Sequence, residues 1–155
     1  PSFLNDGRSG LSGCPGLPAP RSCRRSNTLC GGILASPLMI LVAGPYRSGT
    51  GDDPGLIAAN MRAMNEAALR LFRAGHLPIT GEALALPLVE TAGSTGIVDA
   101  GFDENFHPIG ERVARRCDAC LRIGGPSVGA EAMVAIFQQA GRPVYRSLAE
   151  VPGCA

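Results

Sequence analysis

Two short segments of this chain combine the residue types that bind anions. Residues 44–49 read Gly-Pro-Tyr-Arg-Ser-Gly, and residues 125–129 read Gly-Pro-Ser-Val-Gly. Arg47 could bind two oxygens of one phosphate through its forked guanidinium, and Tyr46 offers a flat face to a base or sugar. The second segment opens a predicted helix, whose free backbone N–H groups suit an anion, and Ser127 adds a hydroxyl.

Each of these segments follows a run of residues that we predict to be a buried strand. Residues 38–43 are consecutively apolar, which is typical of a parallel strand covered on both faces. Because loops after such strands lie at the ligand-binding edge of open α/β sheets, neighbouring strands would bring both segments to one cleft. The predicted binding residues are Gly44, Tyr46, Arg47, Ser48, Ser127 and Gly129. The alternative is two ordinary turns in which Gly and Pro serve only the backbone.

The chain from residue 37 onward alternates predicted strands and helices. The predicted strands cover residues 38–43, 76–80, 120–123 and 142–145. The predicted helices follow Asp53, cover 82–91 with an interruption at Pro87, carry an apolar stripe over 106–117, and run from 130 to Gly141, before a final helical turn at 147–151. This alternation predicts one α/β domain at residues 37–155, a three-layer, flavodoxin-like fold with a parallel sheet of four or five strands.

Residues 1–36 have a different composition, rich in Gly, Pro, Ser, Arg and Cys, and they show no sustained period. Such a segment cannot bury much apolar area, so we predict a disordered tail. The sequence begins with Pro1, whereas Met39 stands at the first predicted strand. One hypothesis is that Met39 is the native start and the preceding residues are not native. The alternative is a flexible tail that carries arginines.

Composition excludes several classes of partner. The 155 residues carry a formal net charge of +1, so no charge excess attracts a nucleic acid polymer or an anionic membrane. No apolar stretch approaches the roughly 20 residues of a membrane helix, and no segment resembles a secretory signal. The expected compartment is therefore the cytoplasm, and the expected partner is a small molecule.

The sequence also gives little support for a metal or a cofactor. Cys117 and Cys120 have CxxC spacing, but Cys14, Cys23 and Cys30 do not form the second pair that a zinc site needs. The glycine patterns match neither a Walker A loop nor a dinucleotide fingerprint, and the chain contains no lysine. We therefore predict no metal and no cofactor, with the two thiols buried as small hydrophobes.

Several motifs in order resemble the nucleoside 2-deoxyribosyltransferase superfamily, in particular a small bacterial branch of it. They are Ile-Leu-Val-Ala-Gly-Pro-Tyr (40–46), Leu-Phe-Arg-Ala-Gly-His (71–76), Cys-Asp-Ala-Cys-Leu-Arg (117–122), Pro-Ser-Val-Gly (126–129) and Gly-Arg-Pro-Val-Tyr (141–145). The resemblance spans residues 38–151. It implies a deoxyribonucleoside or its 5′-monophosphate as ligand. Ser127 to Gly129 is similar to the phosphate-binding turn of the 2′-deoxynucleoside 5′-monophosphate N-hydrolases, and the arginine of the first-strand loop also matches that branch.

The resemblance implies a glutamate nucleophile and an assisting aspartate, but it places them at Met133 and Gly110. A thioether cannot attack an anomeric carbon as a carboxylate does. The first hypothesis is therefore nucleoside or nucleoside monophosphate binding without ordinary transfer. The second is an active N-glycosidase or deoxyribosyltransferase with relocated catalytic carboxylates, Glu82 and Asp103. The third is an interaction module with a vestigial cleft.

Each relocated carboxylate also has a structural interpretation. Glu82 could be an acid at a helix start, favoured there by the helix dipole. Asp103 could cap a helix, and it shares with Glu104 and His107 a predicted loop that could fold over the cleft. His76 is expected to be structural. The family often forms oligomers, and an apolar interface or core burial would explain Leu84, Leu86, Leu88 and Val89 equally well.

Overall fold

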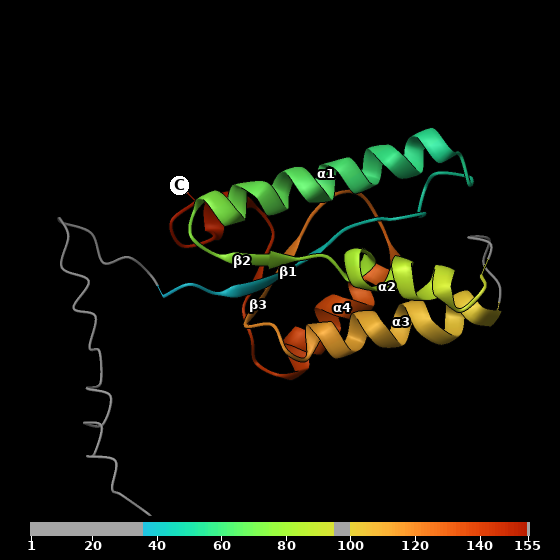
Figure 1. The fold of residues 1–155 in the computed structure, drawn as a ribbon. Coiled ribbons are helices and arrows are strands. Elements are labelled where there is room, and N and C mark those ends of the chain that lie inside the picture. Colours follow the sequence, from blue (N-terminus) through green and yellow to red (C-terminus); the bar gives the residue numbers. More distant parts are fainter. Residues whose placement is uncertain (1–35, 95–99, 155) are drawn as a thin grey trace, which may run out of the picture. The chain divides into compact units, whose positions relative to one another are not determined.

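A computed structural model describes residues 36–94 and 100–154 of the chain, without the side chains of residues 100–104. The predicted tail, apart from its last residue, lies outside this range. The described strands are β1 (Met39–Ala43), β2 (Leu77–Ile79), β3 (Ala119–Arg122) and β4 (Val144–Tyr145). They form one parallel sheet in the order β2-β1-β3-β4, of which Figure 1 labels β1, β2 and β3. The predicted α/β, flavodoxin-like class is confirmed, with four strands.

Helices cover both faces of the sheet. They are α1 (Pro54–Arg73), α2 (Gly81–Thr91), α3 (Ala100–Ala114) and α4 (Val128–Gln139), and a short 3-10 helix η1 (Leu148–Glu150) follows β4. Ile40 and Val42 of β1 pack with α1 on one face. Leu41 and Ala43 pack with α3 and α4 on the other. Both faces of β1 are therefore buried, which explains why its sequence is apolar without alternation.

The ends of α1 are set by local chemistry, as the sequence predicts. Asp53 caps the helix, because its Oδ1 accepts hydrogen bonds from the amides of Gly55 (2.7 Å) and Leu56 (3.0 Å). Gly75 follows the last turn with a φ of +91°, a left-handed conformation that glycine adopts without strain. None of the helices described in this chain is both long and apolar enough to cross a membrane.

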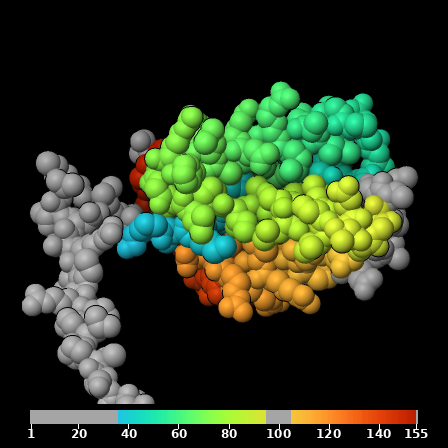
Figure 2. All heavy atoms as spheres, viewed as in Figure 1, coloured from blue at the N-terminus to red at the C-terminus, as the bar shows by residue number. Residues whose placement is uncertain are grey.

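Two predictions about helices were wrong. Pro87 does not interrupt α2, because the helix continues through it and is held to the core by Ala85 and Val89. Asp103 and His107 belong to α3 and not to a loop, since α3 begins at Ala100 and passes through Pro108. Both helices continue although each proline removes one backbone hydrogen bond, and α2 and α3 pack against each other (Figure 2).

His76 joins three segments that are distant in the sequence. Its side chain is buried, its Nδ1 accepts from the amide of Leu38 (3.2 Å), and its Nε2 lies 2.6 Å from the carbonyl oxygen of Pro152. Because Nδ1 faces a donor, the hydrogen must sit on Nε2, which then donates to Pro152. The structure therefore gives His76 the structural role that the sequence suggests.

Candidate functional site

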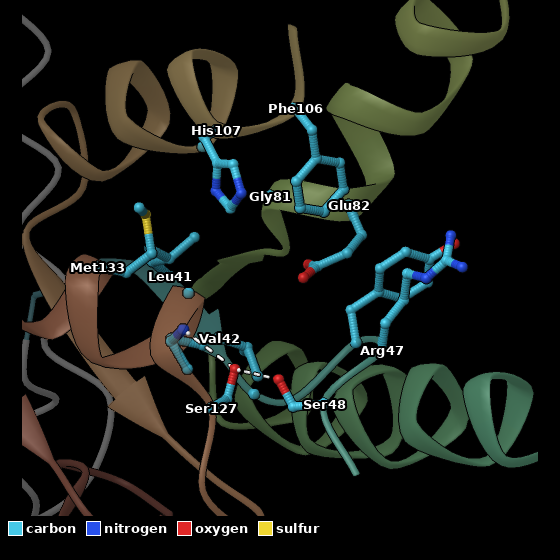
Figure 3. A pocket seen from close by; sticks show the side chains of 16 residues that line it. Leu41, Val42, Arg47, Ser48, Gly81, Glu82, Phe106, His107, Ser127 and Met133 are labelled. Carbon is cyan, nitrogen blue, oxygen red and sulfur yellow. Dashed lines mark hydrogen bonds between the residues drawn. The ribbon is translucent and has the colours of Figure 1, made fainter. Parts of the chain in front are cut away.

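The two strand-exit turns meet, because β1 and β3 are neighbours in the sheet. The hydroxyl of Ser48 donates to Oγ of Ser127 across a distance of 3.1 Å (Figure 3). The turns also touch at Gly124, where a Cβ atom would lie only 2.7 Å from Cδ of Pro45. The sequence prediction that these turns lie side by side therefore holds.

A cavity of about 240 Å³ opens between these turns and the helices α2, α3 and α4. All six predicted binding residues line it: Gly44, Tyr46, Arg47, Ser48, Ser127 and Gly129. Much of the remaining wall is apolar, from Leu41, Val42, Phe106 and Met133. Polar groups among apolar walls are typical of small-molecule sites.

Arg47 is already paired within its own loop. Its Nε and Nη2 donate to Oδ1 of Asp52, at 3.1 and 2.7 Å. The sequence prediction assigned Arg47 to a phosphate and missed Asp52, because an acid five residues away could face in any direction. The only sequence signal for a tight turn here was the glycines near Asp52. In the structure Asp52 itself adopts a left-handed backbone, with a φ of +64°.

The hydroxyl oxygen of Ser127, a residue that lines the cavity, both caps a helix and joins the two turns. Ser127 is the N-cap of α4, where its Oγ accepts from the amide of Ala130 (3.3 Å). The same oxygen accepts from Ser48. With two hydrogen bonds accepted, the Ser127 hydroxyl has only its own proton left to offer a ligand.

Aromatic rings form another part of the wall. Tyr46 stacks on Phe106 of α3, with ring centroids 5.7 Å apart and an angle of 21° between planes. Asn60 fixes the backbone below, donating to the carbonyl of Tyr46 at 3.0 Å. His107 meets the edge of Phe106 and also lines the cavity (Figure 3). The sequence placed Phe106 only in an apolar helical stripe, and such a stripe does not distinguish a core residue from a cavity wall.

Glu82 is the one relocated carboxylate that the structure places at the cavity. It is the second residue of α2, its side chain points into the cavity (Figure 3), and only 9% of the residue is exposed. Burial raises the pKa of this carboxyl, while a hydrogen bond from its own backbone amide opposes the shift. The side chain of Asp103 lies outside the described part of the structure.

Met133 and Gly110 also line the cavity, and they face each other. A Cβ atom built on Gly110 would lie 3.6 Å from the sulfur of Met133. Glu131, two residues away from Met133, faces elsewhere: it accepts from Nε of Arg122 at 2.9 Å and is absent from the cavity lining. The described cavity wall therefore contains one carboxylate, Glu82.

The CxxC pair lies in the core and away from the cavity. Burial is the main cause that raises the pKa of Cys117 to about 11 and that of Cys120 to about 12, so both thiols stay protonated at neutral pH. Within residues 36–94 and 105–154 no three His, Cys, Asp or Glu side chains gather as metal ligands would.

The apolar residues of α2 divide between the core and the surface. Val89 is 3% exposed, which selects core burial of the two alternatives for this residue. Leu84 and Leu88 are exposed, one turn apart on the same face of α2.

A scan of protein-family models and a search of curated proteins each gave no match to this sequence. Functional inference therefore depends on the cavity and its residues.

Proposed function

We propose that the cavity binds a nucleoside or a nucleoside 5′-monophosphate. The observation that carries the proposal is the 3.1 Å contact between Ser48 and Ser127, which joins two strand-exit turns beside the aromatic pair of Tyr46 and Phe106. Such rings stack with the flat face of a base, and the guanidinium of Arg47, which lines the cavity, could bind a phosphate in exchange for Asp52. The volume of about 240 Å³ favours a small ligand over a dinucleotide.

The resemblance to nucleoside deoxyribosyltransferases supports the same class of ligand. The two positions at which it implies carboxylates, Met133 and Gly110, both line the cavity and approach each other. Neither residue can supply a nucleophile or transfer a proton. The first proposed role is accordingly binding, without ordinary deoxyribosyl transfer.

The buried position of Glu82 favours a second candidate function, hydrolysis of an N-glycosidic bond. A carboxylate in this cavity could take a proton from water as the water oxygen bonds to the anomeric carbon. The bond between that carbon and the base would break, and the base would leave with the bonding electron pair and take up a proton. This role requires Glu82 to face the anomeric carbon of the bound sugar.

Thermal denaturation with deoxynucleosides and their 5′-monophosphates tests the binding proposal. We expect an increase in melting temperature, because a ligand selective for the folded state stabilises it by mass action. The Arg47→Gln and Ser48→Ala double variant should lose any preference for the monophosphate over the nucleoside. Ser48 is the better target than Ser127, whose loss would also uncap α4. Arg62→Gln, an exposed change on α1, is the matched control.

Chromatography of the same mixtures distinguishes the two candidate functions. Released base that disappears in Glu82→Gln would establish hydrolysis, whereas stabilisation without release supports binding alone. A protein that no nucleoside or nucleotide stabilises, and that releases no base, would contradict both and leave the interaction module as the surviving hypothesis.

A further inference from the structure

We propose that Asp52 is an internal competitor for the phosphate of a ligand, and that it sets the selectivity between a nucleoside and its monophosphate. The inference builds on the proposed function. Arg47 is the only arginine or lysine among the described residues that line the cavity, and the Asp52 carboxylate occupies one edge of its guanidinium. That edge, formed by Nε and Nη2, is one that a phosphate also uses for two parallel hydrogen bonds.

The loop is folded so as to hold this carboxylate in place. Thr50, which is 5% exposed, organises it: its amide and its hydroxyl both bond to the carbonyl of Arg47, at 3.2 and 2.7 Å. The Thr50 hydroxyl oxygen also accepts from the amide of Asp52 at 3.2 Å. Asp52 then adopts a left-handed backbone, with a φ of +64°, which aspartate tolerates better than most residues. The ion pair is therefore a product of the loop fold.

The exposure of the two partners determines which one would move. The side chain of Asp52 is 72% exposed, while that of Arg47 is 18% exposed. An exposed carboxylate regains water at little cost when it leaves the pair. The guanidinium would stay at the cavity, so an incoming phosphate would displace Asp52 and replace one anion by another.

This exchange lowers the net gain from binding a phosphate. Without Asp52, a monophosphate would meet an Arg47 whose Nε and Nη2 no longer donate to this carboxylate. A nucleoside without phosphate leaves the pair intact and is indifferent to it. Asp52 therefore weakens monophosphate binding while leaving nucleoside binding unchanged.

Titration calorimetry of Asp52→Asn tests the inference, with a deoxynucleoside and its 5′-monophosphate as paired probes. Asparagine keeps the size and the tolerance for a left-handed backbone but removes the charge. We expect the dissociation constant for the monophosphate to fall about two- to fivefold, the range that an exposed ion pair would account for. The constant for the nucleoside should stay unchanged. Glu66→Gln, which removes an exposed acid of α1, should alter neither constant.

The outcomes separate this inference from the function on which it rests. The inference is supported if Asp52→Asn binds the monophosphate more tightly than the unmodified protein does and Glu66→Gln does not. This also holds if the unmodified protein binds only the nucleoside. Unchanged or weaker monophosphate binding by Asp52→Asn would overturn it and assign Asp52 to the orientation of Arg47, while the nucleotide site would stand. If neither probe binds any of the proteins, the proposed function fails and the role of Asp52 fails with it.

Discussion

At the scale of single residues, Glu82 has the least ordinary environment in the cavity. A carboxylate normally stays in water, and burying one that is charged costs free energy. Here the residue as a whole is 9% exposed, and burial is the largest cause of the raised pKa of its carboxyl. A residue kept under such conditions at a cavity wall is a candidate for function.

The raised pKa of Glu82 predicts how stability depends on pH. The folded protein holds the Glu82 proton more tightly than the unfolded chain does, so the contribution of Glu82 to stability is fully present below the unfolded pKa near 4.5. That stability is lost as pH rises through the pKa of the folded state. Glu82→Gln carries no charge, so we expect the variant to be more stable than the unmodified protein at pH 7 and to lose this advantage toward pH 4.

Urea denaturation of both proteins at several pH values between 4 and 8 measures this difference. Glu90→Gln, at an exposed position of the same helix, serves as the control for the loss of one charge. A Glu82→Gln advantage that is constant over the whole range would contradict the assignment, because it would come from packing and not from ionisation.

At the scale of elements, the site depends on the close approach of the turns after β1 and β3. Gly124 has a φ of +76°, and a Cβ there would lie 2.7 Å from the Pro45 ring. We expect Gly124→Ala to destabilise the protein by about 1–3 kcal/mol, through backbone strain and overpacking together. It should also weaken any ligand binding, because the contact between Ser48 and Ser127 spans the same junction.

The neighbouring Gly125 provides the control for this prediction. A Cβ atom at Gly125 meets nothing within 4 Å, and its backbone is not left-handed. Gly125→Ala should therefore change the free energy of unfolding by much less, as measured by urea denaturation. Equal effects of the two substitutions would show that the turns are less tightly packed than the structure indicates.

The elements that sequence predicts best are those whose causes are local. β1 is recognisable from its apolar run, and the start of α1 from Asp53 and Pro54, because burial on both faces and a helix cap each leave a mark in adjacent residues. The course of α3 through Pro108 was missed, since it depends on packing against α2. The low helix propensity of proline predicts that a helix ends near such a residue, and in α3 tertiary contacts override that preference.

At the scale of the whole molecule, the part of the site that follows from the sheet topology is predictable from sequence, and the part that depends on side-chain directions is not. The parallel sheet brings the turns at Tyr46 and Ser127 to one edge, so their meeting follows from topology. The bond between Arg47 and Asp52, and the stacking of Phe106 on Tyr46, depend on side-chain directions and helix rotation. Neither leaves a periodic signal in the sequence.

The buried thiols report on the integrity of the whole domain. Cys117 and Cys120 are about 1% and 0% exposed, with burial raising both pKa values, so reagents should reach them only when the domain unfolds. Peptide mapping after brief alkylation should find them unmodified in the native protein and modified in urea. Cys154, which is partly exposed, is the internal comparison and should react before Cys117 and Cys120. Rapid alkylation of Cys120 in the native protein would contradict the packing of β3.

The hydrogen bonds of His76 have a consequence for the order in which the chain can mature during synthesis. Leu38 and His76 leave the ribosome well before Pro152, which supplies the second partner of the imidazole. Until that carbonyl arrives, the nascent domain holds a ring N–H without its acceptor, a cost for any buried polar group. The hydrogen bonds around this histidine can therefore form only after residue 152 has been synthesised, which makes this part of the core a late one to close.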